Sequence, residues 1–189
     1  MANKVKYGLR NVVYAVITEG EGGTISYGTP VAIPGAVNLS LSAVGDNTDF
    51  YADDVVYFNQ TANQGYEGDL EIAKIPDHFR TAVLGETQDS NGALIESADA
   101  KPKAFALGFE IQGDSKGRRT WLYNCKASRP NQDSQTIEAG ITPQTDTLSL
   151  KAMPRLTDKK VKVSLEDSES SSTAYTGFLT EVYEGATSV

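Results

Sequence analysis

Residues 103–127, KAFALGFEIQGDSKGRRTWLYNCKA, decide the fold of this chain. Large apolar side chains alternate with small or polar ones on both sides of a Gly-rich turn at 113–117, and this period of two is typical of strands. Two such runs around a short turn predict a β-hairpin. We expect the face with the only Trp, Trp121, and with Cys125 to lie at the centre of the core. The other face is small and polar, so we expect it to meet water or a wet surface of a partner.

The rest of the chain repeats the same signals. Alternating or β-branched runs predict further strands at 12–18, 31–43, 66–73 and 145–152. One helix is expected between Pro76 and Gly85, because Pro suits the first helical position and Gly suits the stop. A helix this short is not stable alone, so we expect it to pack on the sheet or to plug an open end.

Bulk composition excludes several classes of function. The chain has 189 residues and a formal net charge of −8, which suits one domain with a small appendage and disfavours tight binding to nucleic acid or to an anionic membrane. No apolar stretch reaches the length of a membrane span. The single cysteine, Cys125, cannot form an internal disulfide, and we expect a buried, inert thiol.

Two segments depart from the strand pattern. Residues 45–65 form a long excursion, which we expect to be a protruding hairpin, with too many large apolar side chains for a disordered loop. These side chains suggest a segment that orders against something else: Phe50, Tyr51, Val55, Val56, Tyr57 and Phe58. Residues 155–189 form a C-terminal arm or extension to a domain at 1–154. Its Ser-rich part is expected to be mobile in the free subunit, and its apolar end, with Tyr175 and Phe178, is expected to dock.

Signals for catalysis are poor. His78 is the only histidine, and no pattern couples it to a nucleophile or to a second metal ligand. The Asp-rich stretch 46–54 fails the calcium-loop spacing. We therefore expect no catalytic residues, no metal and no cofactor. Glu67, Asp69 and Glu71 share one face of a strand, which is either an ordinary solvent face or a surface that must not adhere to DNA.

These residues together resemble a known family, the major tail or tail-tube proteins of bacteriophages with long, non-contractile tails. The resemblance lies in the order and length of five segments across about residues 5–153, and residues 155–189 lie outside it. The segments are Tyr7 to Ala15 (YGLRNVVYA), Leu39-Ser40-Leu41, Gly68 to Ile72 (GDLEI), the central hairpin and Thr147 to Leu150 (TLSL).

The resemblance implies a fold and a function. The fold is an antiparallel β-sandwich or open barrel with one short flanking helix, a long protruding loop and a C-terminal arm. Such subunits form hexameric rings that stack into a tube, which holds a tape-measure protein before double-stranded DNA passes without specific binding. Tail-tip and terminator proteins are further partners, no membrane is involved, and the tail assembles in the host bacterial cytoplasm.

On this interpretation, the residues divide into two groups. The candidates to line the lumen are Glu67, Asp69, Glu71 and Glu110. The candidates for contact between subunits are Phe50, Tyr51, Val55, Val56, Tyr57, Phe58, Tyr175 and Phe178. Lys126 shares the parity of the polar hairpin face and is an exception that points to a subunit contact.

Two other classes of function compete with this interpretation. A monomeric β-sandwich that binds carbohydrate or protein would use the aromatic residues of 45–65 as a platform for its ligand. An all-β hydrolase would need a nucleophile and a base, for which the sequence offers no motif. Electron microscopy separates the first alternative from a tube subunit, because a binding module stays dispersed.

Overall fold

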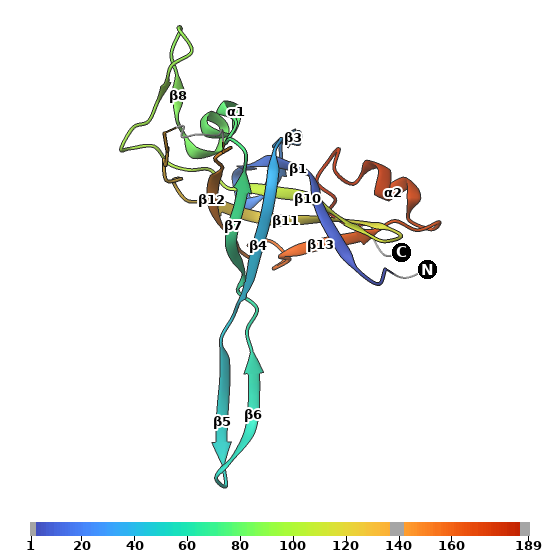
Figure 1. The fold of residues 1–189 in the computed structure, drawn as a ribbon. Helices are drawn as coiled ribbons and strands as arrows, with labels where there is room; N and C mark the ends of the chain where they lie inside the picture. Colours follow the sequence, from blue (N-terminus) through green and yellow to red (C-terminus); the bar gives the residue numbers. More distant parts are fainter. Residues whose placement is uncertain (1–2, 137–141, 186–189) are drawn as a thin grey trace.

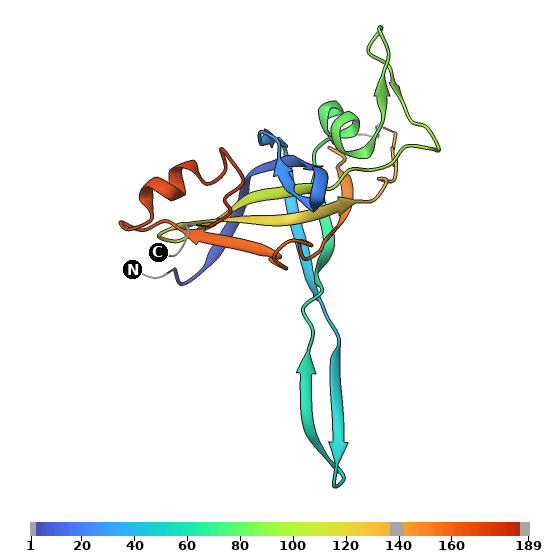
Figure 2. The same ribbon diagram turned by 180° about the vertical axis from the view of Figure 1, so that it is seen from behind.

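The chain is mainly β in a computed structural model that describes residues 3–136 and 142–185 (Figures 1 and 2). The strands are β1 (Lys6–Glu19), β2 (Ile25–Tyr27), β3 (Val31–Ala32), β4 (Ala36–Val44), β5 (Asn47–Ala52), β6 (Val55–Thr61), β7 (Gly65–Ile72), β8 (Thr87–Gln88), β9 (Leu94–Ile95), β10 (Phe105–Gly113), β11 (Gly117–Ala127), β12 (Asp146–Ala152) and β13 (Lys162–Glu166). The helical turns are η1 (Glu21–Gly23), α1 (Asp77–Phe79), η2 (Arg80–Leu84) and α2 (Ser172–Gly177).

One large antiparallel sheet holds most of these strands. Its order is β2-β1-β10-β11-β12-β7-β4, with β3 added to β1 and β13 added to β11. The path ends at β2 and β4, which do not pair with each other, so the sheet of the described residues is open. This confirms the predicted fold class of a mainly β, antiparallel structure with an unclosed sheet.

The sheet bends into two layers at β11. The first half of this strand, 118–122, pairs with β13, whereas residues 125–127 pair with β12. Between the two halves the register with β10 shifts, because Phe105 lies opposite Cys125 while Leu107 lies opposite Leu122. The extra residue is a β-bulge, which increases the local twist. As a result β4 and β7 cross the direction of β10 and β11 (Figure 1).

The main core lies between these two layers, and the predicted helix closes one end of it. Phe79 of α1 and Val83 of η2 are buried in the core. The Phe79 ring meets the Phe105 ring edge-to-face at 5.4 Å between centroids. The predicted helix over 76–85 is thus confirmed, although its second half is a π-helical turn. Gly85 ends it with a left-handed φ of 83°.

The structure corrects our expectation for the two faces of the central hairpin. Neither face is wet, since Phe105 through Glu110 are all buried. Trp121 and Cys125 do not share a face either: Cys125 belongs to the main core, and Trp121 belongs to a second cluster on the other side of the sheet. The bulge in β11 shifts the alternation by one residue, so the side chains that follow it change face.

The second cluster is covered by the C-terminal segment. Phe178 is fully buried against Trp121, Ala15 and Ala106, with Tyr183 among the residues packed around it. Figure 2 shows β13 and α2 beside β10 and β11 rather than apart from them. The segment after residue 155 therefore packs on its own subunit in this structure, and its treatment as a separate arm stays a prediction.

Candidate interaction surfaces

A polar face extends across β4, β7 and β12. Glu67, Asp69 and Glu71 alternate on β7 with side chains that point into the core, such as Leu70 and Ile72. The residues opposite the three carboxylates are short polar residues or a lysine: Asn38, Ser40, Ser42, Thr147, Ser149 and Lys151. Pairing with polar neighbours on both sides makes this a continuous hydrophilic sheet surface.

Two of the three carboxylates are held by hydroxyl groups. Ser149 Oγ donates a hydrogen bond of 2.6 Å to Asp69 Oδ1, and Thr145 Oγ1 donates one of 2.6 Å to Glu71 Oε1. Neither carboxylate forms an ion pair within the part of the chain that the structure describes, so both charges remain uncompensated. The face also carries Lys151, which lies opposite the exposed Lys126.

The excursion at 45–65 is a hairpin that projects away from the body (Figure 1). It consists of β5 and β6, and its six large apolar side chains are 49–73% exposed. Phe50 and Phe58 lie opposite each other in the pairing register. Asp53 and Asp54 form the tip, both with positive φ. The hairpin therefore presents an aromatic and aliphatic surface behind an acidic tip.

Glu110 does not face a lumen or solvent, contrary to our expectation. It is fully buried, and its carboxylate accepts hydrogen bonds from Arg10, Arg119 and Asn11. Burial alone would raise the pKa of Glu110, but the three donors outweigh burial and the pKa is lowered. A buried carboxylate whose oxygens are both occupied is not a surface charge, so Glu110 is removed from the candidates to line a lumen.

The two C-terminal candidates for subunit contacts also lie within the subunit. Phe178 is 1% exposed, and its carbonyl accepts a hydrogen bond of 2.6 Å from Trp121 Nε1. The Tyr175 ring stacks under the Arg119 guanidinium at 4.2 Å. These side chains anchor the C-terminal segment to its own sheet, so in this conformation Phe178 has no surface to offer another subunit.

The described residues contain no group of three or more His, Cys, Asp or Glu side chains that could hold a metal ion. His78 packs parallel to Tyr14, and its Nδ1 lies 3.0 Å from the Tyr14 hydroxyl. Cys125 is buried, as predicted, and burial raises the pKa of its thiol to about 12. No helix in the described part of the chain has the length and apolar character to cross a membrane.

A comparison with protein families decides the assignment that the resemblance suggested. A family model described as phage tail tube protein matches residues 2–156, most of the chain. The chain belongs to the phage tail tube protein family. Comparison with curated proteins gave no match. The family places this tail tube protein in the tail of a bacteriophage virion and indicates a structural rather than an enzymatic role.

The family match ends beside a charged cluster in this tail tube protein that sequence reasoning missed. Arg155 is buried, with its guanidinium on Asp158 and 4.2 Å above the Tyr123 ring. The Asp158 pKa falls to about 2, chiefly through the hydrogen bond from Arg155. Glu184 pairs with the same Arg155 at 3.4 Å. The spacing of Arg155 and Asp158 was visible in the sequence, but the contacts of Arg155 with the Tyr123 ring and with Glu184 were not.

Proposed function

We propose that copies of this chain assemble into rings, hexameric as in the resemblance above, that stack into the tail tube and conduct DNA into the host. The observation that carries the proposal is the β5–β6 hairpin. Its apolar side chains contribute nothing to either core of the described subunit, and monomeric proteins rarely expose a contiguous apolar surface of this kind. A subunit contact gives these side chains a partner.

The edge of the sheet supports lateral assembly. Within the described residues β4 ends the sheet path and pairs only with β7, so one row of its backbone donors and acceptors is free. Exposed edges are a liability that proteins cover or pair. Pairing β4 with the sheet of a neighbouring subunit would extend the polar face of β4, β7 and β12 around a lumen.

The polar face suits the passage of DNA. Glu67, Asp69 and Glu71 are carboxylates on a surface that otherwise consists largely of hydroxyl and amide groups. Such a surface repels phosphates, and apart from Lys151 and Lys126 it offers few of the cationic contacts that release counterions and create affinity. The tape-measure protein before ejection, and the tail-tip and terminator proteins at the tube ends, are the partners expected of a tube subunit.

Deletion of residues 48–61 tests the assembly role. Ala62 N donates a hydrogen bond of 2.9 Å to Asp46 O, so the ends of the deletion lie close together and a short link can join them. We expect a folded, soluble subunit that no longer forms tubes in negative-stain images at a concentration where the wild type does. The control is Leu156→Ser, which removes an exposed apolar side chain from the body and should leave tubes unchanged.

Two results would count against the proposal. Tubes of normal length from the deletion variant would exclude the hairpin as an assembly element. Dispersed wild-type monomers at all concentrations would favour the alternative, a binding module that uses the hairpin aromatics as a platform for carbohydrate or protein.

Replacing Glu67, Asp69 and Glu71 together by lysine tests the lumen. Tubes should still form, since all three side chains lie on the polar face and not in the core. Ejection of DNA from tails built with this variant should slow, most strongly at low salt, where screening is weakest. Normal ejection at low salt from correctly assembled tails would remove these residues from the lumen.

A further inference from the structure

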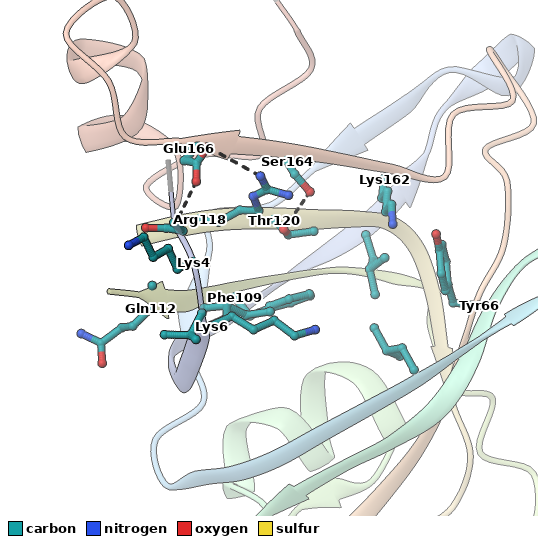
Figure 3. Close-up of a pocket in the computed structure, with 16 residues that line it drawn as sticks. Lys4, Lys6, Tyr66, Phe109, Gln112, Arg118, Thr120, Lys162, Ser164 and Glu166 are labelled. Carbon is teal, nitrogen blue, oxygen red and sulfur yellow. Dashed lines mark hydrogen bonds and ion pairs between the residues drawn. The ribbon is translucent and has the colours of Figure 1, made fainter. Parts of the chain in front are cut away.

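The two ends of the two-layered body are built differently. At one end α1 and η2 close the main core. At the other end, from which the β5–β6 hairpin leaves, a groove of about 570 Å³ opens between the layers. Apolar side chains from both layers form its floor: Leu41, Tyr66, Phe109, Ile111 and Leu122. Figure 3 labels Tyr66 and Phe109 among them.

The rim of this groove is cationic. Lys162 lies beside Tyr66 at one end, with its Nζ 4.5 Å from the ring centroid, and Lys4 and Arg118 lie at the other end (Figure 3). Arg118 is compensated by Glu166 at 3.6 Å. Lys4 and Lys6 are exposed and take part in none of the ion pairs within the described residues. The groove thus combines an apolar floor with unpaired positive charge, in a chain whose net charge is −8.

A feature of the opposite charge projects from the other end of the subunit. The β8–β9 hairpin points away from the body on the side opposite to β5–β6 in both views (Figures 1 and 2). Residues 86–99 contain four acidic residues and no lysine or arginine. Glu86 and Glu96 pair with Arg80 and Arg129 at the base.

Two carboxylates of this segment stay unpaired, and the segment also carries an exposed apolar side chain. Asp89, in the turn between β8 and β9, and Asp99, in the loop after β9, are exposed and form no ion pair among the described residues. Ile95 on β9 is 52% exposed. An acidic tip with an exposed aliphatic side chain behind it complements a groove with a cationic rim and an apolar floor.

We propose that the groove receives the β8–β9 hairpin of a second copy of this chain in the adjacent ring. The inference rests on the proposed function and deepens it. An open tube requires head-to-tail contacts, in which one surface meets a different surface of the next copy. Such a stack turns the β5–β6 end of each subunit towards the β8–β9 end of the next one. The β5–β6 hairpin projects from the same end as the groove. In a head-to-tail stack it therefore faces the β8–β9 end of the next copy and not the groove of that copy.

Charge exchange between the two surfaces tests the contact. Lys4→Glu with Lys6→Glu reverses the rim, and Asp89→Lys with Asp99→Lys reverses the two unpaired carboxylates of residues 86–99. We expect each double variant to raise the critical concentration for tube assembly at least about tenfold, because like charges then face each other across the interface. The variant with all four substitutions restores opposite charges, and its critical concentration should return to within about threefold of the wild-type value.

The control reverses two exposed lysines elsewhere, Lys151→Glu with Lys159→Glu, and should leave tube assembly unchanged. Circular dichroism and elution volume of each monomer establish that the fold is intact. Engineered cysteines add a geometric readout: Lys6→Cys and Asp89→Cys subunits, mixed before assembly, should form an intermolecular disulfide, and the buried Cys125 should not compete.

The outcomes separate this inference from the proposed function. If the wild type forms no tubes, the proposed function fails. If the wild type forms tubes and the rim reversal does as well, only the groove contact is overturned. The contact is also overturned if the rim reversal is rescued by Asp53→Lys with Asp54→Lys instead, because the occupant is then the β5–β6 hairpin.

Discussion

Replacing Glu110 by glutamine should destabilise the subunit strongly, although the sequence pattern alone predicts an ordinary exposed strand carboxylate at this position. Its side chain is 0% exposed, and the Arg10 and Arg119 side chains that it binds are 50% and 18% exposed. Removing one member of a buried ion pair costs about 3–5 kcal/mol, because the partner is left buried without compensation. Since the half-exposed Arg10 can turn to water, we expect the lower end, about 3 kcal/mol.

The measurement is the free energy of unfolding by urea at pH 7, with the melting temperature as a second readout. A loss of about 3 kcal/mol corresponds to a decrease of roughly 6–12 °C for a chain of this length. Glu71→Gln is the matched control. Its carboxylate accepts one hydrogen bond on the polar face, so we expect it to cost less than about 1 kcal/mol.

The pH dependence distinguishes loss of charge from loss of packing. The pKa of Glu110 is lower in the folded chain than in the unfolded chain, so its contribution is fully present above the unfolded value of about 4.3 and is lost as the pH falls through the folded pKa. The stability gap between wild type and Glu110→Gln should therefore narrow below about pH 4. A gap under 1 kcal/mol at pH 7, or one that stays constant on acidification, would refute this account.

Two further outcomes follow from buried side chains. Phe178→Ala should release the C-terminal segment from Trp121 and lower the free energy of unfolding by about 3–5 kcal/mol. Rapid proteolysis between residues 158 and 183 with the body intact would show the release, and equal protection of variant and wild type would contradict it. Cys125 should resist alkylation at pH 8 in the native subunit and react at once in urea, because burial raises the pKa of its thiol to about 12.

Much of the fold could be predicted because its signals are local. Alternation located the strands at 31–43 and 145–152, and Pro76 with Gly85 bounded the helix. The hairpin at 45–65 was predicted because its large apolar residues do not follow the alternation of the sheet strands and are too many for a disordered loop. Each inference needed only neighbouring residues and the period of one element.

The errors came from features that are not local. A bulge changed the face of Cys125 relative to Trp121, and alternation cannot show an inserted residue until the partner strand is known. Glu110 appeared to face water because two of the three side chains that bind its carboxylate, Arg10 and Asn11, lie about 100 residues earlier. Asn11 also adopts a positive φ of 52°, at an irregularity in β1 that no turn signal marks.

The C-terminal segment shows how far the family describes this chain. The family match ends at residue 156, yet Phe178 and most of the partly buried residues packed around the Trp121 cluster come later in the chain. Main-chain carbonyls provide most of the polar attachment: those of Tyr175, Phe178 and Tyr183 accept from Arg119, Trp121 and Tyr123. Donors on the body therefore fix where the segment lies without specifying its side chains.

Phe178 provides the main apolar contact of the attachment, because it is the most deeply buried side chain among the described residues of the segment. Any segment with a large apolar residue at this position and free carbonyls around it can cover the same face. Conversely, a chain cut at residue 156 would expose the Trp121 face and lose β13 from β11, leaving an apolar surface beside an open strand edge. The sheet shared with the family is therefore complete in this protein only with the segment that lies outside the match.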